Sequence, residues 1–559
     1  MLPVMLMGDS VEFRKARGAF FTPYPIAQFL VQWALRGGRR SVLDPTCGEG
    51  VFLLAAADEA AGERPLDLFG VDIHADSLEE TQRLLLQAGH AGASLLTGDF
   101  FEEVSPDQIG ARIPFVDAVV GNPPFVRYHE HRGDVRRRAS AAALAQGVRV
   151  SGLASSWAPL LVHASSFLKP DGRIAMVVPA ELLSVGYAEP IRQWLRRRFK
   201  SVHLVLFDRL QFHDAEEQVV LLVAQGSGGC SAFNLHEVSD AQELQNLHVF
   251  DSEAFTPSDT GKWTELLVPD DVRGILRNTT ADEFHALEKF GRVELGTVTG
   301  ANKFFTLSES TRLEYNLVEG KHLRRTVPPG TRHLTGLRFT PGQWEQLRLK
   351  GERVWLLDPA EGTKAVGGFG RYVALGKQLE VDQGYKCSGR TPWWRPPVQD
   401  TPDMFFTYMS HVTPRLIANE AGAAYVNSMH GLTFGDDVND VVRAALPFVT
   451  LNTLTMLSAE ITGRSYGGGI LKMEPREASQ LMVPGDDVAC RAWDLLKDRH
   501  HELDRLVRTR NWSAVVDIVD EALLVNTLGI AEGDLRKLCA ALKRQRLRRQ
   551  RREIADGSE

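Results

Sequence analysis

The feature that most constrains this chain is a regular alternation of apolar, strand-like runs and amphipathic helical stretches over residues 1–225. This alternation is typical of an α/β fold, a doubly wound Rossmann-like sheet with helices on both faces. The last two strand candidates are joined by a segment too short for a helical crossover, so we expect them to pair antiparallel at the end of the sheet. The strand candidates are residues 41–45, 68–73, 94–99, 117–122, 172–179, 201–207 and 218–224.

The length of 559 residues predicts more than one domain. We expect the α/β domain to occupy residues 1–240 and a connecting region of mixed polarity to follow at 241–289. Residues 290–485 are rich in Gly, Pro and Trp, with short strand-like runs and no sustained helical period, which favours a mixed α+β domain. The helical period returns in residues 486–559, which predict a helical C-terminal segment with a basic tail.

Composition excludes several classes of protein. The five cysteines form no CxxC pair, which argues for a reducing, cytoplasmic location and against a metal site such as structural zinc. No apolar run is long enough to span a membrane. The net charge of -7 argues against a uniformly basic DNA-binding protein, although local positive potential would suffice. Arginine runs occur at 136–138 and 196–198 and in the tail at 543–552, and each is most simply a solvent-exposed helix face.

Three consecutive predicted strands end in acidic residues, at Asp44, Asp72 and Asp99. The carboxyl ends of such strands are where open α/β sheets bind ligands. After the first strand, Gly48 and Gly50 allow the backbone to approach a ligand closely. A carboxylate at the end of the second strand suits a ribose diol, Asp99 suits an adenine amine, and Phe100 could stack on the adenine ring. The sequence has no GxxxxGK[ST] loop, which disfavours a nucleoside triphosphatase.

The fourth predicted strand ends in Asn122-Pro123-Pro124-Phe125. Two prolines stop the strand and fix a rigid turn. An aromatic amine is a poor nucleophile because its lone pair is delocalised into the ring. If the Asn122 side-chain oxygen and the Pro123 carbonyl oxygen accept its N–H bonds, the lone pair becomes available to attack a methyl donor. The turn therefore predicts methyl transfer to an amine.

These motifs, in this order, resemble the γ-class (TaqI-type) DNA adenine-N6 methyltransferases of restriction-modification and related defence systems. The resemblance covers residues 13–225 and includes FFTPYPIAQFLVQWA at 20–34, with Thr22 near the methionine moiety of the cofactor. It implies S-adenosyl-L-methionine as the cofactor and methylation of a flipped-out adenine at a specific DNA site. The cofactor-binding residues expected on this basis are Thr22, Asp44, Gly48, Gly50, Asp72, Ile73, Asp99, Phe100 and Asn122.

A target adenine must leave the duplex to reach such a pocket. By resemblance, Phe125 and Phe212 are expected to stack on its two faces. Segments beginning at 296 resemble a target recognition domain, which implies double-stranded DNA as a partner. The residues that we expect to contact DNA are Asn302, Lys303, Arg390, Trp393, Arg395, Tyr466 and Lys472.

Two alternatives remain open from the sequence. One is a methyltransferase acting on RNA or on protein glutamine, because those families also carry NPP(F/Y). The other is a DNA-binding subunit of a larger defence complex. No convincing PD…(D/E)xK nuclease pattern is present, so modification without cleavage is favoured, with a companion restriction endonuclease or defence subunit as a further partner.

Overall fold

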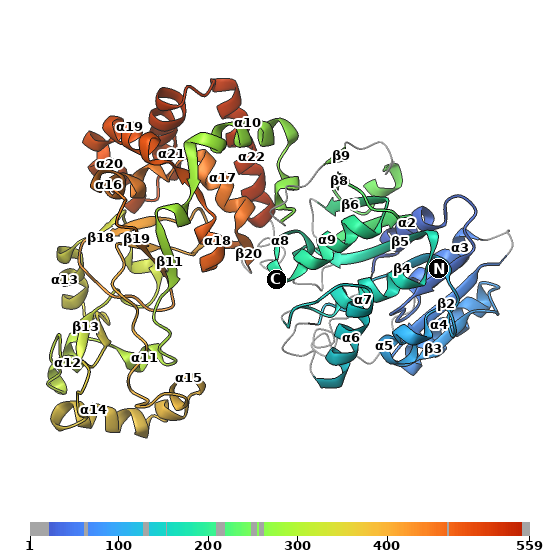
Figure 1. Ribbon diagram of the computed structural model, residues 1–559, viewed down its shortest axis with the longest axis horizontal. Helices are drawn as coiled ribbons and strands as arrows, with labels where there is room; N and C mark the ends of the chain where they lie inside the picture. The colour runs from blue at the N-terminus through green and yellow to red at the C-terminus, as the bar shows by residue number, and fades with distance from the viewer. Residues whose placement is uncertain are drawn as a thin grey trace. The chain divides into compact units, whose positions relative to one another are not determined.

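The computed structural model of the chain consists of two compact units, and the chain passes from the first to the second between Leu267 and Val268, inside the predicted connecting region (Figure 1). Each unit is described by itself below. The residues that the structure describes are 22–60, 65–126, 133–152, 154–207, 219–247, 254–255, 262–466 and 469–550.

The first unit is built on a nine-stranded sheet in the order β3-β2-β1-β4-β5-β7-β6-β8-β9. Strands β3 to β5 in this order are mutually parallel, while β7 runs antiparallel to both of its neighbours, β5 and β6. The bounds are β1 (Ser41–Asp44), β2 (Asp67–Asp72), β3 (Ser94–Thr97), β4 (Val116–Gly121), β5 (Leu168–Pro179), β6 (Ser201–Phe207), β7 (Val219–Gln225), β8 (Phe233–Val238) and β9 (Ala254–Phe255).

The predicted doubly wound sheet and the antiparallel pairing of its sixth and seventh strands are thus confirmed. The prediction that the sheet ends with this pair is wrong. Strand β8 pairs parallel to β6, and β9 pairs antiparallel to β8. Strand β8 includes the polar residues Asn234, His236 and Glu237, and β9 has only two residues, so neither has the long apolar run that reveals a central strand.

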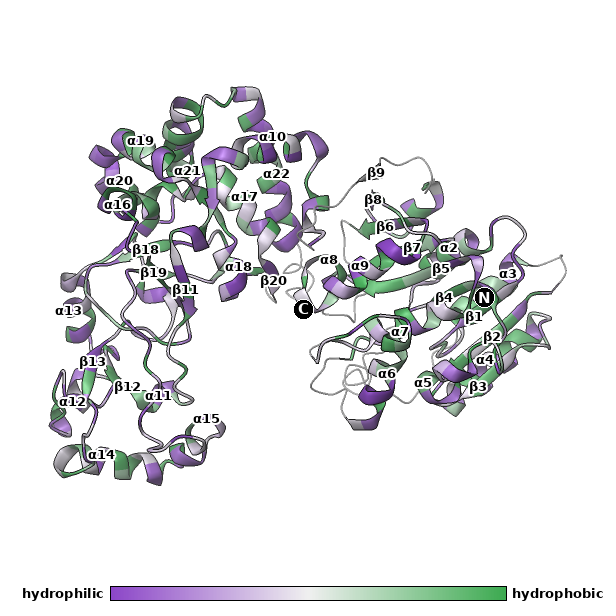
Figure 2. Cartoon of the chain, viewed as in Figure 1, coloured by the Kyte–Doolittle hydropathy of each residue, from purple (hydrophilic) through white to green (hydrophobic). Residues whose placement is uncertain are grey.

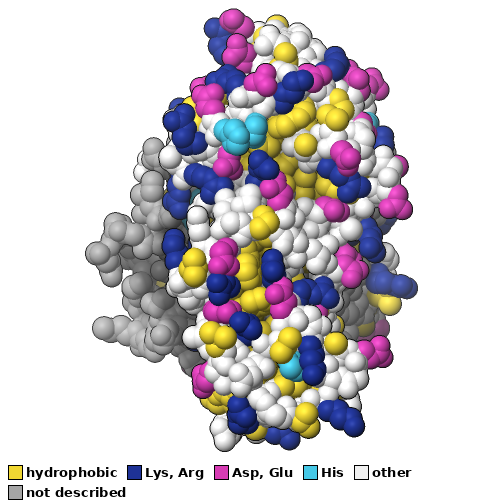
Figure 3. Space-filling view, turned by 90° about the vertical axis from the view of Figure 1, so that its left-hand side faces the viewer, with side chains coloured by type: hydrophobic (Ala, Val, Ile, Leu, Met, Phe, Trp, Pro, Cys, Tyr) yellow, Lys and Arg dark blue, Asp and Glu magenta, His cyan; other side chains and the backbone are white. Residues whose placement is uncertain are grey.

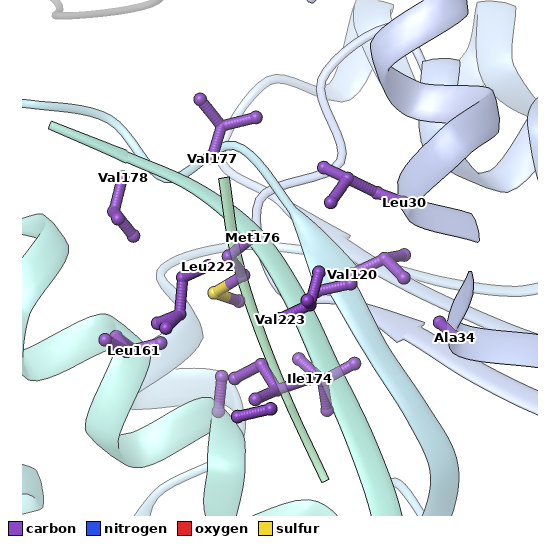
Figure 4. Packing of buried hydrophobic residues seen from close by; sticks show 14 of the residues in the cluster. Leu30, Ala34, Val120, Leu161, Ile174, Met176, Val177, Val178, Leu222 and Val223 are labelled. Atoms are coloured by element: carbon purple, nitrogen blue, oxygen red, sulfur yellow. The ribbon is translucent and has the colours of Figure 1, made fainter. Parts of the chain in front are cut away.

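Helices cover both faces of this sheet, which explains why its central strands consist mainly of buried apolar residues. Val120 of β4, Ile174 and Met176 of β5 and Val223 of β7 pack together in the core (Figure 4). Figure 2 shows the sheet as mainly hydrophobic beneath helices of mixed character. The helices are α2 (Tyr24–Leu35), α3 (Val51–Glu59), α4 (Ala75–Gln87), α5 (Phe100–Glu103), α6 (Gly133–Ala145), α7 (Trp157–Ala164), α8 (Glu181–Ser184) and α9 (Glu189–Arg198).

The strand order creates one preferred ligand position. From β1 the chain continues to β2 and β3 on one side, and it then returns to place β4 on the other side of β1. The carboxyl ends of β1 and β4 therefore flank a topological switch point, where open α/β sheets bind their ligands. Asp44 ends β1, and Asn122 directly follows β4.

The second unit combines small sheets with helices. A five-stranded sheet has the order β11-β19-β16-β18-β14, two three-stranded sheets have the orders β12-β15-β13 and β17-β21-β20, and β10 pairs with β22. The strands are β10 (Phe284–Ala286), β11 (Gly291–Leu295), β12 (Thr306–Leu307), β13 (Leu323–Arg325), β14 (Arg338–Phe339), β15 (Trp355–Leu357), β16 (Met404–Phe406), β17 (Met409–Ser410), β18 (Leu416–Asn419), β19 (His430–Phe434), β20 (Arg464–Tyr466), β21 (Ile470–Lys472) and β22 (Met482–Pro484).

The α-helices of the second unit lie before, between and after these strands. They are α10 (Asp270–Glu283), α11 (Asn302–Phe305), α12 (Glu309–Glu314), α13 (Pro341–Leu349), α14 (Gly367–Gln378), α15 (Tyr385–Ser388), α16 (Asp440–Val449), α17 (Thr453–Thr462), α18 (Pro475–Ser479), α19 (Asp486–Leu496), α20 (His500–Arg508), α21 (Trp512–Asp520) and α22 (Glu532–Gln550).

Two of these helices correct the sequence interpretation of residues 290–485, where we expected no sustained helical period. Helix α17 is buried over most of its length, so polar and apolar residues do not alternate with a helical period. Helix α14 contains four glycines among its twelve residues, which lowers its helical propensity. Tertiary packing stabilises both helices in spite of these local signals.

The basic tail also differs from the expectation of a solvated helix face. Helix α22 packs against α17 and buries Leu538, Leu542 and Arg549. Among the arginines that follow Lys543 in this helix, Arg549 is buried, Arg546 and Arg548 are half-buried, and Arg544 is exposed, so one arginine of the tail belongs to the core of the second unit. In the first unit, Arg138 of α6 pairs with Asp99 and Glu102 at 3.1 and 3.0 Å.

Charge on the visible surface is mixed. On the face shown in Figure 3, Lys and Arg side chains are interspersed with Asp and Glu around apolar side chains. This face lacks the continuous positive surface that would bind a nucleic-acid backbone. Within the described residues, no single helix has the length and apolar content of a membrane span, and one bent helix pair, α16 with α17, meets those criteria together.

Candidate functional site

The glycine turn after β1 is held open by its neighbours. The Gly48 backbone N–H donates to Asp72 Oδ2 at 2.9 Å, and the Gly48 carbonyl oxygen accepts from Thr81 Oγ1 of α4 at 3.1 Å. Gly50 has a φ of +77°, and a Cβ there would lie 2.4 Å from Thr81. The turn consequently requires glycine at position 50 for both conformation and space. Thr81 is a supporting residue that no sequence motif indicated.

Asp44 lies at the base of this turn and is fully buried. Its Oδ1 accepts from the Thr46 backbone N–H at 3.2 Å, whereas its Oδ2 has no hydrogen-bond partner among the described residues. Burial, with a smaller contribution from the nearby Asp72 carboxylate, raises the pKa of Asp44 to about 8. A cationic group placed beside Oδ2 would favour the ionised form and satisfy the unpartnered oxygen.

The end of β2 presents a polar and an apolar group together. The second oxygen of Asp72, Oδ1, accepts from the His74 backbone N–H at 2.9 Å, so both carboxylate oxygens are already oriented. The next side chain, Ile73, is 62% exposed, which is unusual for a large apolar residue. An oriented carboxylate beside an exposed apolar side chain suits a nucleoside, with ribose on the first and a base on the second.

The end of β3 matches the expectation less well. Asp99 caps α5 by accepting from the Phe101 backbone N–H at 3.0 Å, and it pairs with Arg138. The Phe100 ring is 3% exposed and packs on His163 and Phe167, with centroids 5.1 and 5.7 Å away. Stacking on an adenine requires that at least one face of the ring be accessible. The Phe100 ring is buried, so it does not offer a stacking surface here. Its contribution to a cofactor site would come from its backbone.

Two predicted site residues that lie 100 positions apart are in contact. The Asn122 Nδ2 group donates a hydrogen bond to Thr22 Oγ1 at 3.1 Å. Thr22 immediately precedes the Pro23 cap of α2 and is buried. The contact directs the amide nitrogen toward Thr22, which sets the orientation of the whole amide group.

The turn after Asn122 is held by two serines that precede α7. Ser156 Oγ donates to the Pro124 carbonyl oxygen and accepts from the Val126 backbone N–H at 2.9 Å. Ser155 Oγ donates to the Val126 carbonyl oxygen, also at 2.9 Å. The main chain on both sides of Phe125 is therefore rigid. No sequence motif indicated Ser155 or Ser156, because they act from a separate segment.

The two aromatic residues expected to sandwich a base differ in status. Phe125 is 7% exposed and belongs to the core of the first unit. Phe212 lies outside the described residues. Pro123 is buried, while Asn122 and Pro124 are half-buried at the edge of the sheet.

Most of the residues predicted to contact DNA make internal contacts in the second unit. Arg390 donates to the Thr299 and Val298 carbonyl oxygens, both at 2.7 Å. Asn302 Nδ2 donates to Asn427 Oδ1 at 3.0 Å. The structure therefore gives Arg390 and Asn302 roles in holding the 298–302 loop.

The two predicted residues that follow Arg390 also pack internally. Trp393 packs against the Phe304 ring, with centroids 5.6 Å apart. Arg395 donates to the Ala360 carbonyl oxygen at 3.0 Å.

The other three predicted residues are more accessible. Lys303 is exposed, and Tyr466 is 54% exposed. Lys472 Nζ lies 5.2 Å from the centroid of the Tyr466 ring and 2.7 Å from Glu474 Oε1. Tyr466 lies next to the tip of the hairpin formed by β20 and β21, and Lys472 lies opposite Arg464, at the other end of β21.

Comparison with known proteins agrees with this arrangement. Residues 5–207 match the family model described as N-6 DNA Methylase. Residues 260–524 match the model described as Type II methyltransferase M.Eco57I, C-terminal domain. The chain is an S-adenosylmethionine-dependent DNA methyltransferase.

Two curated relatives span most of this methyltransferase. Type II methyltransferase M.AccI of Acinetobacter calcoaceticus is 21% identical, over 85% of this chain and 86% of the relative. Type II methyltransferase M.XamI of Xanthomonas campestris pv. amaranthicola is 25% identical, over 85% and 87%. Among solved structures, the type IIG restriction endonuclease BpuSI aligns with a TM-score of 0.41 and 14% identity, over 98% of this chain and 68% of that chain.

The residues at the switch point fit the cofactor of the methyltransferase. The unpartnered Asp44 Oδ2 suits its ammonium group, and the oriented Asp72 carboxylate suits its ribose. Adding a Cβ at Gly48 would meet no atom within 4 Å, so the loop leaves open space beside its backbone. The exposed Ile73 suits the adenine ring.

Proposed function

We propose that this DNA methyltransferase is the modification enzyme of a restriction-modification system and that it methylates the N6 amine of adenine at a specific site in double-stranded DNA. The observation that carries the proposal is the Asn122 amide, oriented by Thr22 at the carboxyl edge of β4. The names of the relatives, both Type II methyltransferases, support the biological setting.

The Asn122-Pro123 pair supplies the acceptors that an aromatic amine needs. Asn122 Oδ1 and the Pro123 carbonyl oxygen each accept one N–H bond of the amine, which draws the nitrogen toward tetrahedral geometry. The hydrogen bond to Thr22 sets the orientation of the Asn122 amide, and Ser156 keeps the Pro124 carbonyl in place. When bound, S-adenosylmethionine supplies an electrophilic methyl group on sulfur, and the amine gives up a proton after the transfer.

Access to this pair requires the adenine to leave the duplex, because its amine is otherwise paired within the stack. Phe125 adjoins the acceptors, and we assign it and Phe212 to the two faces of the extruded base. Aromatic stacking would then offset part of the few kcal/mol that extrusion costs. Since Phe125 is almost buried, its contact with a base would involve the edge or one limited face.

Site recognition is assigned to the second unit. Among the predicted contacts, Lys303 and Tyr466 are exposed, and Lys472 is half-buried and pairs with Glu474 beside Tyr466. Lysines suit phosphate oxygens, and an exposed tyrosine suits a sugar or a base face. Arg390, Asn302, Trp393 and Arg395 support this unit from within and are not proposed as contacts.

The test is to express the chain in a methylation-free bacterial host and to sequence its DNA with detection of modified bases. N6-methyladenine at one short recurring sequence, absent with Asn122→Ala, supports the proposal. Purified enzyme is then offered duplex DNA, RNA and a glutamine-containing peptide. Methylation of RNA or peptide, with DNA left unmodified, would replace it with one of the alternatives. Sequence-specific DNA binding without transfer to any of the three would indicate a recognition subunit.

A further inference from the structure

A buried ion pair links the C-terminal helix α22 to helix α17. The Arg549 guanidinium donates to both carboxylate oxygens of Glu460, with Nε at 2.9 Å from Oε2 and Nη2 at 2.7 Å from Oε1. Each side chain is only 4% exposed. Breaking a bidentate pair at this depth would leave a charged carboxylate or guanidinium buried without its partner, which is strongly unfavourable. The pair therefore holds the two helices in a defined relative position.

The same guanidinium reaches two further backbone oxygens. Arg549 Nη1 donates to the carbonyl oxygen of Gly469, and Nη2 donates to that of His411 at 3.1 Å. Gly469 adjoins β21 at the tip of the β20–β21 hairpin, and His411 directly follows β17, which pairs with β21. Arg549 thus ties together α17 and two points on the three-stranded sheet β17-β21-β20.

Gly469 is suited to this close approach. Its φ of +63° favours glycine, and a Cβ there would lie 3.1 Å from Gln550 Cα. The main chain of the hairpin tip therefore rests directly against α22. Tyr466, which is exposed, and Lys472 belong to the same hairpin, and Lys472 Nζ lies 5.2 Å from the centroid of the Tyr466 ring.

We propose that Arg549 is a positioning residue for DNA recognition, which sets the β20–β21 hairpin, and with it Tyr466 and Lys472, at a fixed place relative to the rest of the second unit. The inference rests on the proposed function for the role of the hairpin. The match to the family model of the C-terminal domain ends at residue 524, so α22 and Arg549 are not part of it. The contacts of α22, and not a sequence motif, carry it.

Arginine is the residue that this position requires. The bonds to Glu460, Gly469 and His411 leave from three nitrogens of one planar group, so the three partners are fixed relative to one another. Lysine would retain the positive charge next to Glu460, but a single ammonium group cannot reach all three partners in the same plane. Arg549→Lys therefore removes the positioning while preserving the charge.

The experiment compares Arg549→Lys with Arg544→Lys in the full-length enzyme. Arg544 is an exposed arginine on the same helix, so this control makes the same chemical change without altering the contacts of Arg549 with Glu460 and the hairpin, which we call the Arg549 clamp. We expect Arg549→Lys to raise the KM for target DNA about tenfold, the scale of one lost specific contact, with kcat and cofactor affinity unchanged. Arg544→Lys should leave KM within twofold.

A double variant separates positioning from general stability. If Arg549 acts through the hairpin, Tyr466→Ala should raise KM in the parent enzyme and add little in the Arg549→Lys background, because both changes remove the same contact. Fully additive effects, or an unchanged KM with a lowered melting temperature, would overturn the proposal. Hydrogen exchange at β20 and β21 should rise in Arg549→Lys and not in Arg544→Lys.

The hydrogen-exchange measurement needs no substrate, so it distinguishes two failures. If the enzyme methylates no DNA but hydrogen exchange in the hairpin rises in Arg549→Lys, the positioning role of Arg549 is supported and the proposed function is refuted. An active enzyme whose hairpin exchange is unaltered loses the clamp alone. If Arg549→Lys does not fold, Glu460→Gln gives the same comparison, since it keeps the shape of the partner and removes its charge.

Discussion

The two units of this methyltransferase differ in how their functional residues relate to the sequence. In the first unit, short motifs lie at the ends of strands, and the strand order alone brings Asp44 and Asn122 to one edge. In the second unit, the polar side chains that stand out in the sequence are mostly engaged in holding loops, as Arg390 is. The accessible hairpin there depends on Arg549, which lies 80 residues from Gly469.

This difference shows that a site can be predicted from sequence when the topology of the fold dictates where its residues lie. A large number of polar residues is not sufficient. Parallel strands deliver their carboxyl ends to a common edge whatever the loops contain. Small sheets and loops have no such rule, so a conspicuous Arg or Trp in them is as able to bind its own main chain as a ligand. The following predictions test this contrast, beginning with the largest expected effect.

The sharpest test of the first unit is Asn122→Ala. Removing the acceptor should lower kcat by about 100-fold or more, because the interaction stabilises charge that develops only during transfer. Cofactor affinity by calorimetry and DNA affinity by gel shift should stay within a few-fold of the parent. Activity within a few-fold of the parent would show that the amide is not part of the reaction.

For the second unit, Arg390→Ala should behave as a stability variant. It removes two charged hydrogen bonds to the 298–299 main chain, at a cost of about 2 kcal/mol in the free energy of unfolding. Cofactor affinity should not change. Lys303→Ala, which alters an exposed residue nearby, should weaken DNA binding without lowering the melting temperature. The reverse assignment of these two phenotypes would break the contrast drawn above.

A smaller effect is expected at Thr22. Thr22→Val keeps the shape of the side chain but removes the acceptor for Asn122 Nδ2, so the amide loses its fixed orientation. Loss of one such bond, about 1 kcal/mol, corresponds to a drop of several-fold in the single-turnover rate. Thr22→Ser, which retains the hydroxyl, should restore most of it. Equal rates for the Val and Ser variants would mean that the hydroxyl does not orient the amide.

The smallest effect concerns pH and Asp520, whose oxygens accept from the Thr453 backbone N–H and hydroxyl at 2.8 and 2.6 Å. Burial raises the pKa of Asp520 to about 6, from a usual value near 4. Protonation is thus easier in the folded state, and its stabilising contribution is full below pH 4 and lost as pH rises through 6.

Asp520→Asn keeps the shape and cannot ionise. Its Oδ1 can still accept from the Thr453 N–H, while its Nδ2 would donate to the Thr453 hydroxyl oxygen in place of the bond that Asp520 accepts. The difference in the free energy of unfolding between the variant and the parent should therefore shift in favour of the variant by about 1 kcal/mol when the pH is raised from 5 to 7.5. Urea unfolding at the two pH values measures this gain. A constant difference between variant and parent at both values would contradict the raised pKa.

Much of the first unit could be predicted from the sequence. The seven predicted strands all exist, and Thr22, Asp44, Asp72 and Asn122 are close to the expected edge because motif order and topology coincide. Thr81 and Ser156 could not be found in this way. They stabilise the motifs from other segments, and a single Ser or Thr in a sequence carries no signal of its distant partner.

In the second unit, fewer features could be predicted from the sequence. Its mixed α+β character was evident in composition, but α17 was not predicted, because a helix buried on all sides has no polar face. The tail was predicted as a solvated basic surface, yet Arg549 is buried beside Glu460. Charge in a sequence indicates exposure only until a partner of opposite charge is found, and Glu460 lies 89 residues away.

The position of α22 has a consequence for the timing of activity during synthesis. Every described element of the catalytic unit, and every other described element of the second unit, leaves the ribosome before α22 does. A nascent chain can therefore complete the methyl-transfer site while the hairpin still lacks Arg549. If Arg549 positions the hairpin as proposed, full affinity for target DNA would be reached only after α22 has emerged and docked.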